Sequence, residues 1–135
     1  MEKKAFRVPT PLLIALAGLL SSCSSTPTSS TPTVTETFTG TVNAQGFSTK
    51  TFIAGQAGEV DVTLTALTPQ SSITMGLGVG QILTDGSCGF LNYSEAAKVS
   101  TVVSGTGSAG TDCVTLYDIG NVSGADNYTL TVVHP

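Results

Sequence analysis

Three kinds of residue in this 135-residue chain could carry chemistry: three cysteines, one histidine and a group of carboxylates near its C-terminal end. Nucleophilic hydrolysis needs a nucleophile, a base and a group that orients the base. Serine is abundant, but His134 is the only histidine, and its position next to the end of the sequence predicts a solvated side chain. The chain therefore offers no catalytic triad, and we expect that it is not an enzyme.

Four oxygen-bearing side chains follow one another closely and are predicted to gather near one end of the fold: Asp112, Asp118, Asn121 and Asp126. Oxygen ligands of this kind bind Ca²⁺, and paired carboxylates can serve a glycosidase. However, the sequence has no dense Asp-x-Asp-x-Asp loop, and Asp and Asn more often form turns by bonding to nearby backbone. These residues are weak candidates for a calcium site, and we expect no other cofactor.

Cys88 and Cys113 remain as an even pair if Cys23 has a separate role. In an exported protein such a pair predicts a disulfide. A metal site would need more ligands than these two cysteines and His134. Closing a loop of this length by a disulfide contributes about 3.5 kcal/mol in the chain-entropy model.

The first residues have the pattern of an export signal. Residues 1–7 carry three basic side chains, and the mostly apolar residues 8–20 are too few to cross a hydrocarbon core of roughly 30 Å as a helix. The sequence Leu20-Ser21-Ser22-Cys23 resembles the lipobox of bacterial lipoproteins. This resemblance implies cleavage before Cys23, a diacylglycerol on its thiol and an acyl chain such as palmitate on its amino group. Because Ser24 and not Asp follows, the chain resembles lipoproteins sorted to the outer membrane.

The predicted organisation is a signal peptide over residues 1–22, a lipidated Cys23 with a Ser/Thr/Pro-rich linker up to residue 35, and one domain over residues 36–135. The linker cannot bury an apolar face, so it is expected to act as a stalk. From Cys23 onward, two basic residues face eight acidic ones. This balance argues against a nucleic-acid partner and against electrostatic binding to anionic lipid. Membrane contact is therefore expected through the lipid anchor.

Short segments that alternate between apolar and polar residues predict an all-β domain. We expect about eight strands, in an antiparallel β-sandwich or jelly roll. The candidate strands cover residues 37–42, 47–53, 59–66, 73–80, 88–93, 98–104, 113–119 and 128–132. The aromatic residues expected in the core or in cross-strand packing are Phe38, Phe47, Phe52 and Tyr128, and those expected at the surface are Tyr93 and Tyr117.

In the segment from residue 73 to residue 80, glycines at positions 76, 78 and 80 share one face. They predict a flat outer surface that another chain could approach closely. The strand patterns at residues 38–42, 58–64, 110–118 and 128–132 resemble, in order, those of the bacterial pre-peptidase C-terminal domain. That family is a non-catalytic, jelly-roll-like domain with accessory roles in secretion, surface attachment or substrate contact. Asp112 departs from the family's frequent aromatic residue.

Together these features predict a non-enzymatic, lipid-anchored protein of the cell envelope that acts as a binding, adhesion or structural module. Its partner would be an envelope protein or polymer that meets the Thr/Gly face or a strand edge. The alternative is a calcium- or carbohydrate-binding, lectin-like module, or an enzyme that uses the loop carboxylates.

Overall fold

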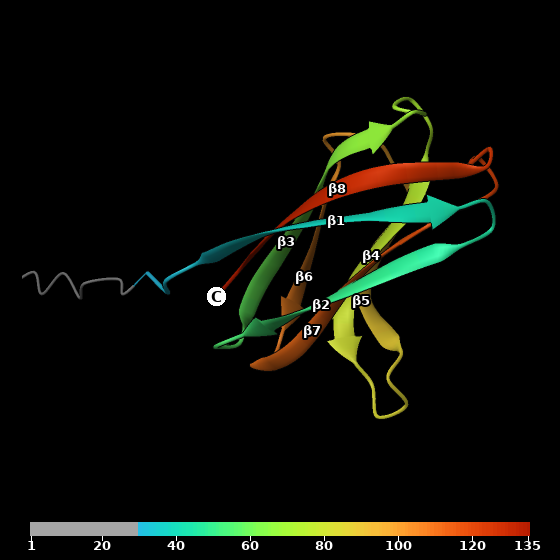
Figure 1. Cartoon of the computed structure of the whole chain (residues 1–135). Coiled ribbons are helices and arrows are strands. Elements are labelled where there is room, and N and C mark those ends of the chain that lie inside the picture. Colours follow the sequence, from blue (N-terminus) through green and yellow to red (C-terminus); the bar gives the residue numbers. More distant parts are fainter. Residues whose placement is uncertain (1–29) are drawn as a thin grey trace, which may run out of the picture.

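The computed structural model describes residues 30–135, which form eight strands and no helix (Figure 1). The strands are β1 (Val34–Asn43), β2 (Phe47–Ala54), β3 (Gly58–Thr68), β4 (Met75–Ile82), β5 (Cys88–Ala97), β6 (Val102–Gly107), β7 (Gly110–Tyr117) and β8 (Ala125–His134). The predicted signal peptide, Cys23 and most of the predicted linker lie outside the described residues. Within residues 30–135, no helix is long and apolar enough to cross a membrane.

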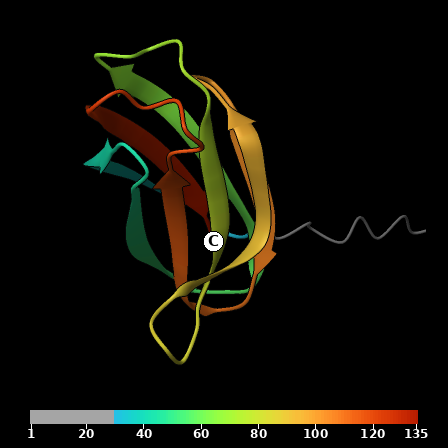
Figure 2. The same cartoon turned by 90° about the vertical axis from the view of Figure 1, so that its right-hand side faces the viewer.

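The strands form two four-stranded sheets that pack face to face (Figure 2). The first sheet has the order β1-β8-β3-β6 and the second has the order β2-β7-β4-β5, and all neighbouring strands are antiparallel. Every connection along the chain except that between β4 and β5 crosses from one sheet to the other. Eight strands in two such sheets make a jelly roll, which confirms the predicted fold class.

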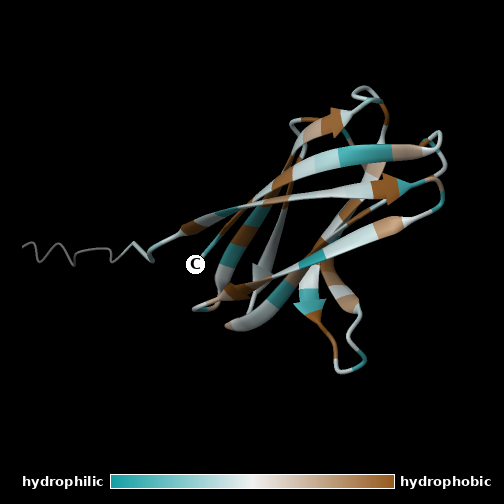
Figure 3. Ribbon diagram, viewed as in Figure 1, coloured by the Kyte–Doolittle hydropathy of each residue, from teal (hydrophilic) through white to brown (hydrophobic). Residues whose placement is uncertain are grey.

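The core lies between the sheets and comes from the alternation seen in the sequence (Figure 3). In β3, Val60, Val62 and Leu64 are at most 2% exposed, whereas Glu59 on the opposite face is exposed. The inward residues of both sheets form one cluster: Val42, Phe52, Val60, Val62, Leu64, Leu67, Met75, Leu77, Val79, Ala97, Val103, Val114, Leu116, Val122, Tyr128, Leu130 and Val132. Burial of this continuous apolar surface is the main stabilisation of the fold.

Several strand boundaries differ from the predicted ones. Val34 and Thr35, assigned to the linker, belong to β1 because they pair with the last residues of β8. Strand β7 begins at Gly110 and ends at Tyr117, earlier than predicted at both ends. It ends there because the Asp118 carboxylate accepts backbone N–H groups from the residues that follow, and these bonds turn the chain.

The glycine face of β4 is not an open surface, so this prediction was wrong. Residues 75–80 are buried on both faces of the strand. A Cβ atom at Gly76 would lie 2.1 Å from the Tyr117 ring, and one at Gly78 would lie 2.6 Å from the Phe90 ring. At Gly80 it would lie 2.0 Å from a backbone carbonyl oxygen of β5. The glycines accept side chains and backbone of the same chain, and they leave no room for a partner there.

Candidate functional site

A depression lies on the outer face of the second sheet. Two hollows of about 480 and 380 Å³ adjoin each other and share Phe47, Phe90 and Thr115. One extends to the β4–β5 loop at residues 85–88, and the other extends to Tyr117 and Asp118. We call the two hollows together the aromatic groove. Because its lining combines exposed rings with a few polar groups, it has the composition of a binding site.

Strands β2 and β7 form the floor and one wall of the groove. Their antiparallel register places Phe47 opposite Tyr117 and Thr49 opposite Thr115, and the hydroxyl oxygens of the two threonines are 2.8 Å apart. Phe47 is 73% exposed, so its predicted place in the core or in cross-strand packing was wrong. Phe52 is buried, and successive residues of a strand point to opposite faces, so Phe47, five positions away, must face outward. The spacing of Phe47 and Phe52 in the sequence was therefore sufficient to predict that they lie on opposite faces of the strand.

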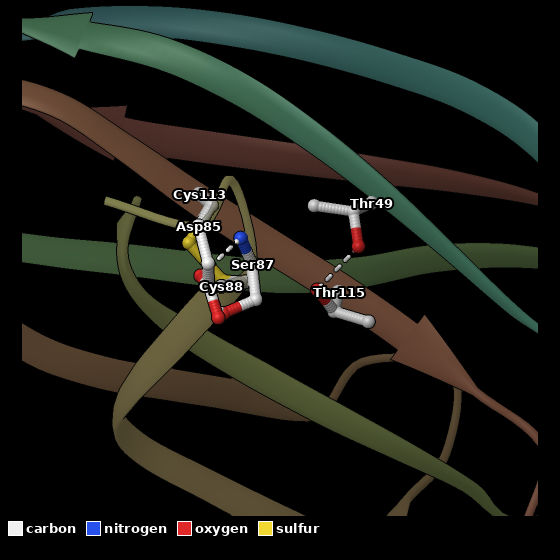
Figure 4. The surroundings of a disulfide bond; sticks show 6 residues. All are labelled: Thr49, Asp85, Ser87, Cys88, Cys113 and Thr115. Atoms are coloured by element: carbon white, nitrogen blue, oxygen red, sulfur yellow. Dashed lines mark hydrogen bonds between the residues drawn. A yellow bond between two sulfur atoms is a disulfide. The ribbon is translucent and has the colours of Figure 1, made fainter. Parts of the chain in front are cut away.

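The opposite wall is the β4–β5 hairpin, which folds back over the glycine face. The predicted disulfide between Cys88 and Cys113 is confirmed, and the two Cα atoms are 5.8 Å apart. This bond joins β5 to β7 across β4, which lies between them in the sheet. Figure 4 shows the disulfide beside Asp85, Ser87 and the Thr49–Thr115 pair. The hairpin wall is therefore covalently attached to the groove floor.

Three rings form a cluster along the hairpin side of the groove. The Phe90 ring stacks on Tyr117 with centroids 6.1 Å apart and planes at 16°, and it lies 6.2 Å from Tyr93. Tyr93 is 58% exposed, as predicted, whereas Tyr117 is half-buried against Gly76. Burial raises the pKa of the Tyr117 hydroxyl, and the nearby Glu95 carboxylate raises it further. The Tyr117 ring is thus packed between the Gly76 position and the Phe90 ring.

Two carboxylates lie at the ends of the groove. The Ser87 hydroxyl and backbone N–H both donate to Asp85, and these bonds hold the pKa of Asp85 below its ordinary value. Partial burial pushes the pKa of Asp118 upward, but the backbone N–H groups that donate to its carboxylate outweigh burial and leave the pKa lowered. These N–H groups belong to Gln45, Gly120, Asn121 and Val122. Both carboxylates therefore remain ionised at neutral pH.

The four candidate metal ligands do not form one site. Asp112 and Asp118 are six residues apart along β7 and its end, which separates them by about 20 Å. Asp112 points into the core, where burial raises the pKa of its carboxyl group, and Asp126 is also buried and accepts the N–H of Gln70. The Asn121 amide donates to a backbone carbonyl of Thr74. In the described part of the chain, no three His, Cys, Asp or Glu side chains lie together as metal ligands could.

His134 is buried and not solvated, so that prediction was wrong. Only 2% of its surface is exposed, and its ring lies 4.8 Å from the Phe52 ring. Its Nε2 donates to Glu36 Oε1 at 2.9 Å. The alternation of β8 places His134 on the same inward face as Leu130 and Val132. The side chain is packed and bonded, and it faces no serine or threonine hydroxyl among its hydrogen-bond partners.

No protein-family model matches this chain, and no curated protein sequence matches it. Among solved structures, the Yersinia pseudotuberculosis-derived mitogen has a TM-score of 0.56 and 16% sequence identity, covering 76% of this chain and 86% of that one. Aeromonas hydrophila PliG, a periplasmic inhibitor of g-type lysozyme, has a TM-score of 0.48 and 12% identity, covering 74% and 84%. At these identities the mitogen shows a shared fold alone, and the weaker likeness to PliG carries no argument. The resemblance to the pre-peptidase C-terminal domain stays a prediction.

Proposed function

We propose that this chain is a non-enzymatic, lipid-anchored binding protein of the bacterial cell envelope, and that the aromatic groove is its binding site. The observation that carries the proposal is the exposure of Phe47 and Phe90 in one groove, at 73% and 41%. Exposed apolar groups gathered in a depression mark sites of interaction in proteins that are otherwise polar outside. Full burial of one phenylalanine side chain by a partner contributes about 1.5–3 kcal/mol.

The pre-formed shape of the groove also supports binding. The disulfide fixes the hairpin wall to the floor, and the stacked rings of Phe90 and Tyr117 fill the glycine face behind it. A site that needs little ordering on binding loses less conformational entropy, so more of the contact free energy appears as affinity.

The proposed membrane attachment rests on the first 23 residues. The lipobox-like sequence ending at Cys23 supplies the acylated thiol, and two or three acyl chains give stable anchoring where one does not. The first strand begins at Val34, so ten residues separate it from Cys23 and span at most about 35 Å when extended. This length would allow the domain to stand clear of the membrane surface, with the outer membrane as the proposed location.

The proposal of a non-enzymatic role is supported by the surroundings of the residues that could act as acids or bases. The Nε2 of His134 donates a hydrogen bond to Glu36, and the Asp118 carboxylate accepts hydrogen bonds from four backbone N–H groups. Asp112 and Asp126 point into the core. Of these four side chains, Asp118 lines the aromatic groove, and both of its carboxylate oxygens already accept backbone N–H groups.

Site-specific photocrosslinking in the original bacterium would test the proposal. A photoreactive phenylalanine analogue at Phe47 in the tagged full chain is expected to capture a discrete partner. The same analogue at Val102, an exposed apolar residue on the first sheet, is the matched control. Capture that is equal at both positions, or absent at Phe47, would reject the groove as the binding site.

Intact mass of the membrane-derived protein tests the anchor separately. The native chain is expected to begin at Cys23 with added acyl mass, and Cys23→Ala is expected to lose both that mass and its membrane fraction. A native chain without acyl mass, cut elsewhere, would reject the lipoprotein assignment and leave the groove proposal to be judged by the crosslinking.

A further inference from the structure

We infer that the aromatic groove receives a basic segment of a partner protein, with arginine or lysine side chains lying over its exposed rings. The inference rests on the proposed function of the groove as the binding site. It adds the chemical class of the partner, which the fold alone does not give.

The groove carries acidic side chains at both of its ends. Asp85 lines one hollow and Asp118 lines the other, and Glu95 lies near Tyr117. Among the described residues that line the two hollows, none is lysine or arginine. A groove with acidic groups at both ends and no basic group attracts cations and repels phosphate-bearing polymers.

Both of these carboxylates are held in the ionised form by hydrogen bonds. Hydrogen bonds from Ser87 lower the pKa of Asp85, and backbone N–H groups lower that of Asp118 in spite of its partial burial. Both groups therefore keep their negative charge down to acidic pH. One Asp85 oxygen accepts both Ser87 bonds, and no bond from a described residue is made to its other oxygen.

The apolar surface of the groove is aromatic. Phe47 and Phe90 line the groove and are 73% and 41% exposed, and Tyr93, whose ring lies 6.2 Å from that of Phe90, is 58% exposed. Aromatic ring faces attract ammonium and guanidinium groups, and arginine stacks on them most often. A basic segment can lay its side chains over the rings and bring positive charge near Asp85 and Asp118, whereas an apolar segment would bring no opposite charge to these carboxylates.

The net negative charge of the domain also favours a basic partner. From Cys23 onward the chain has eight acidic and two basic residues. A field of this sign speeds the approach of a basic partner, and it gives the association a strong dependence on salt.

Binding of labelled peptides would test the inference. The full-length chain is placed in nanodiscs of zwitterionic phosphatidylcholine, so that the membrane itself does not attract a basic peptide. The probe is a short fluorescein-labelled peptide of alternating arginine and leucine, and the matched probe carries glutamate in place of arginine. Fluorescence anisotropy is read at low and physiological salt. We expect binding of the arginine probe only, weakened roughly tenfold or more by physiological salt.

Variants then assign the binding to the groove. Phe47→Ala is expected to weaken it roughly tenfold, and Asp85→Asn with Glu95→Gln roughly fivefold. Asn at position 85 keeps the oxygen that accepts the Ser87 bonds, so the loop is preserved. The control is Glu59→Gln, which removes an exposed carboxylate on the first sheet and is expected to change binding less than twofold.

Three results would overturn the inference: equal binding of the two probes, no binding of the arginine probe, or equal effects of the groove and Glu59 charge changes. An oligosaccharide of N-acetylglucosamine is tested alongside. If it binds in a Phe47-dependent way and the arginine probe does not, the groove is a sugar site. In that case the proposed binding function stands and the basic partner is rejected, whereas failure of crosslinking at Phe47 would reject both.

Discussion

The outer faces of the two sheets differ in what they present to a partner. The first sheet carries a row of exposed threonines on β1, at positions 35, 37, 39 and 41. The Thr41 hydroxyl donates a hydrogen bond of 2.7 Å to the side-chain oxygen of Asn127 on the neighbouring strand β8. Of the nine exposed large hydrophobic side chains among residues 30–135, only Val34 and Val102 belong to this sheet, and the other seven come from the second sheet and its loops. The same strand geometry thus yields one hydroxyl-covered face and one aromatic groove.

The difference has a structural origin in β4 and the disulfide. On the first sheet, the outward residues of β1 are threonines, and each strand lies beside its neighbour in the sheet. On the second sheet, the glycines of β4 let β5 and its rings lie across the strand, and Cys88–Cys113 holds them there. The groove is the product of this covering of β4 by β5, so changes that release β5 from β4 should remove the difference between the two faces.

The largest effect is expected from loss of the disulfide. Reduction, or the Cys88→Ala/Cys113→Ala pair, should lower the free energy of unfolding by about 3.5 kcal/mol. For a domain of this size the melting temperature should fall by roughly 10 °C or more. Groove binding should fall with it, because the hairpin wall is no longer attached to β7. Thermal unfolding with mass-verified reduction checks this, and an unchanged melting temperature would contradict it.

A side chain on the glycine face should come next. Gly80→Ala places a Cβ atom 2.0 Å from a β5 carbonyl oxygen, so backbone must shift, at a cost of about 3 kcal/mol. Gly55→Ala is the matched control, since an added Cβ there meets nothing within 4 Å. Chemical denaturation of both variants measures the contrast. Equal stabilities would mean that β5 does not lie across β4 as described.

The buried Asp112 carboxyl group predicts a pH dependence that belongs to the core and not to either outer face. Burial raises its pKa, while the Gln81 amide and His134 oppose the rise. A raised pKa in the folded state means that stability falls as pH rises from the ordinary aspartate pKa through the raised one. Asp112→Asn should remove this fall and increase stability at neutral pH by about 1–2 kcal/mol, with little change at acidic pH.

Asp118 should behave in the opposite way, because its folded-state pKa is lowered. The stability that it adds is present above the ordinary aspartate pKa and is lost as pH falls through the lowered value. Denaturation curves of wild type and Asp118→Asn across acidic pH measure this difference. If the two carboxyl groups gave the same sign of pH dependence, the described placement of one of them would be wrong.

The smallest effect on stability, and the sharpest on function, is expected at Phe47. Because its ring is mostly exposed, Phe47→Ala should change the free energy of unfolding by less than about 0.5 kcal/mol. Thr37→Ala on the first sheet should have a similarly small effect. Only the Phe47 variant should lose partner capture. Loss of capture in both, or in neither, would remove the distinction between the two faces.

Three of the wrong predictions share one cause. Phe47, Asp112 and His134 were placed by residue type or by position near a chain end, whereas their side chains follow the period-two alternation of their strands. Val114 and Leu116 put Asp112 on the inward face, and the same reasoning applies to the other two. The alternation of inward and outward residues was therefore visible in the sequence. It predicts the burial of Asp112 and His134 better than the general preference of acidic and histidine side chains for water.

The sequence by itself determined the eight alternating strands, the sandwich class and the even cysteine pair, because these depend on local pattern and on simple counting. It also marked the glycines of β4 as unusual. Only the tertiary structure decided what covers them, since Tyr117 reaches Gly76 through the β4–β7 pairing across a long stretch of chain, and Phe90 reaches Gly78 through the register of the β4–β5 hairpin. Phe47 and Phe90 come to line one groove for the same reason. Local periodicity fixes which way a side chain points, but which strands become neighbours depends on the packing of the whole chain.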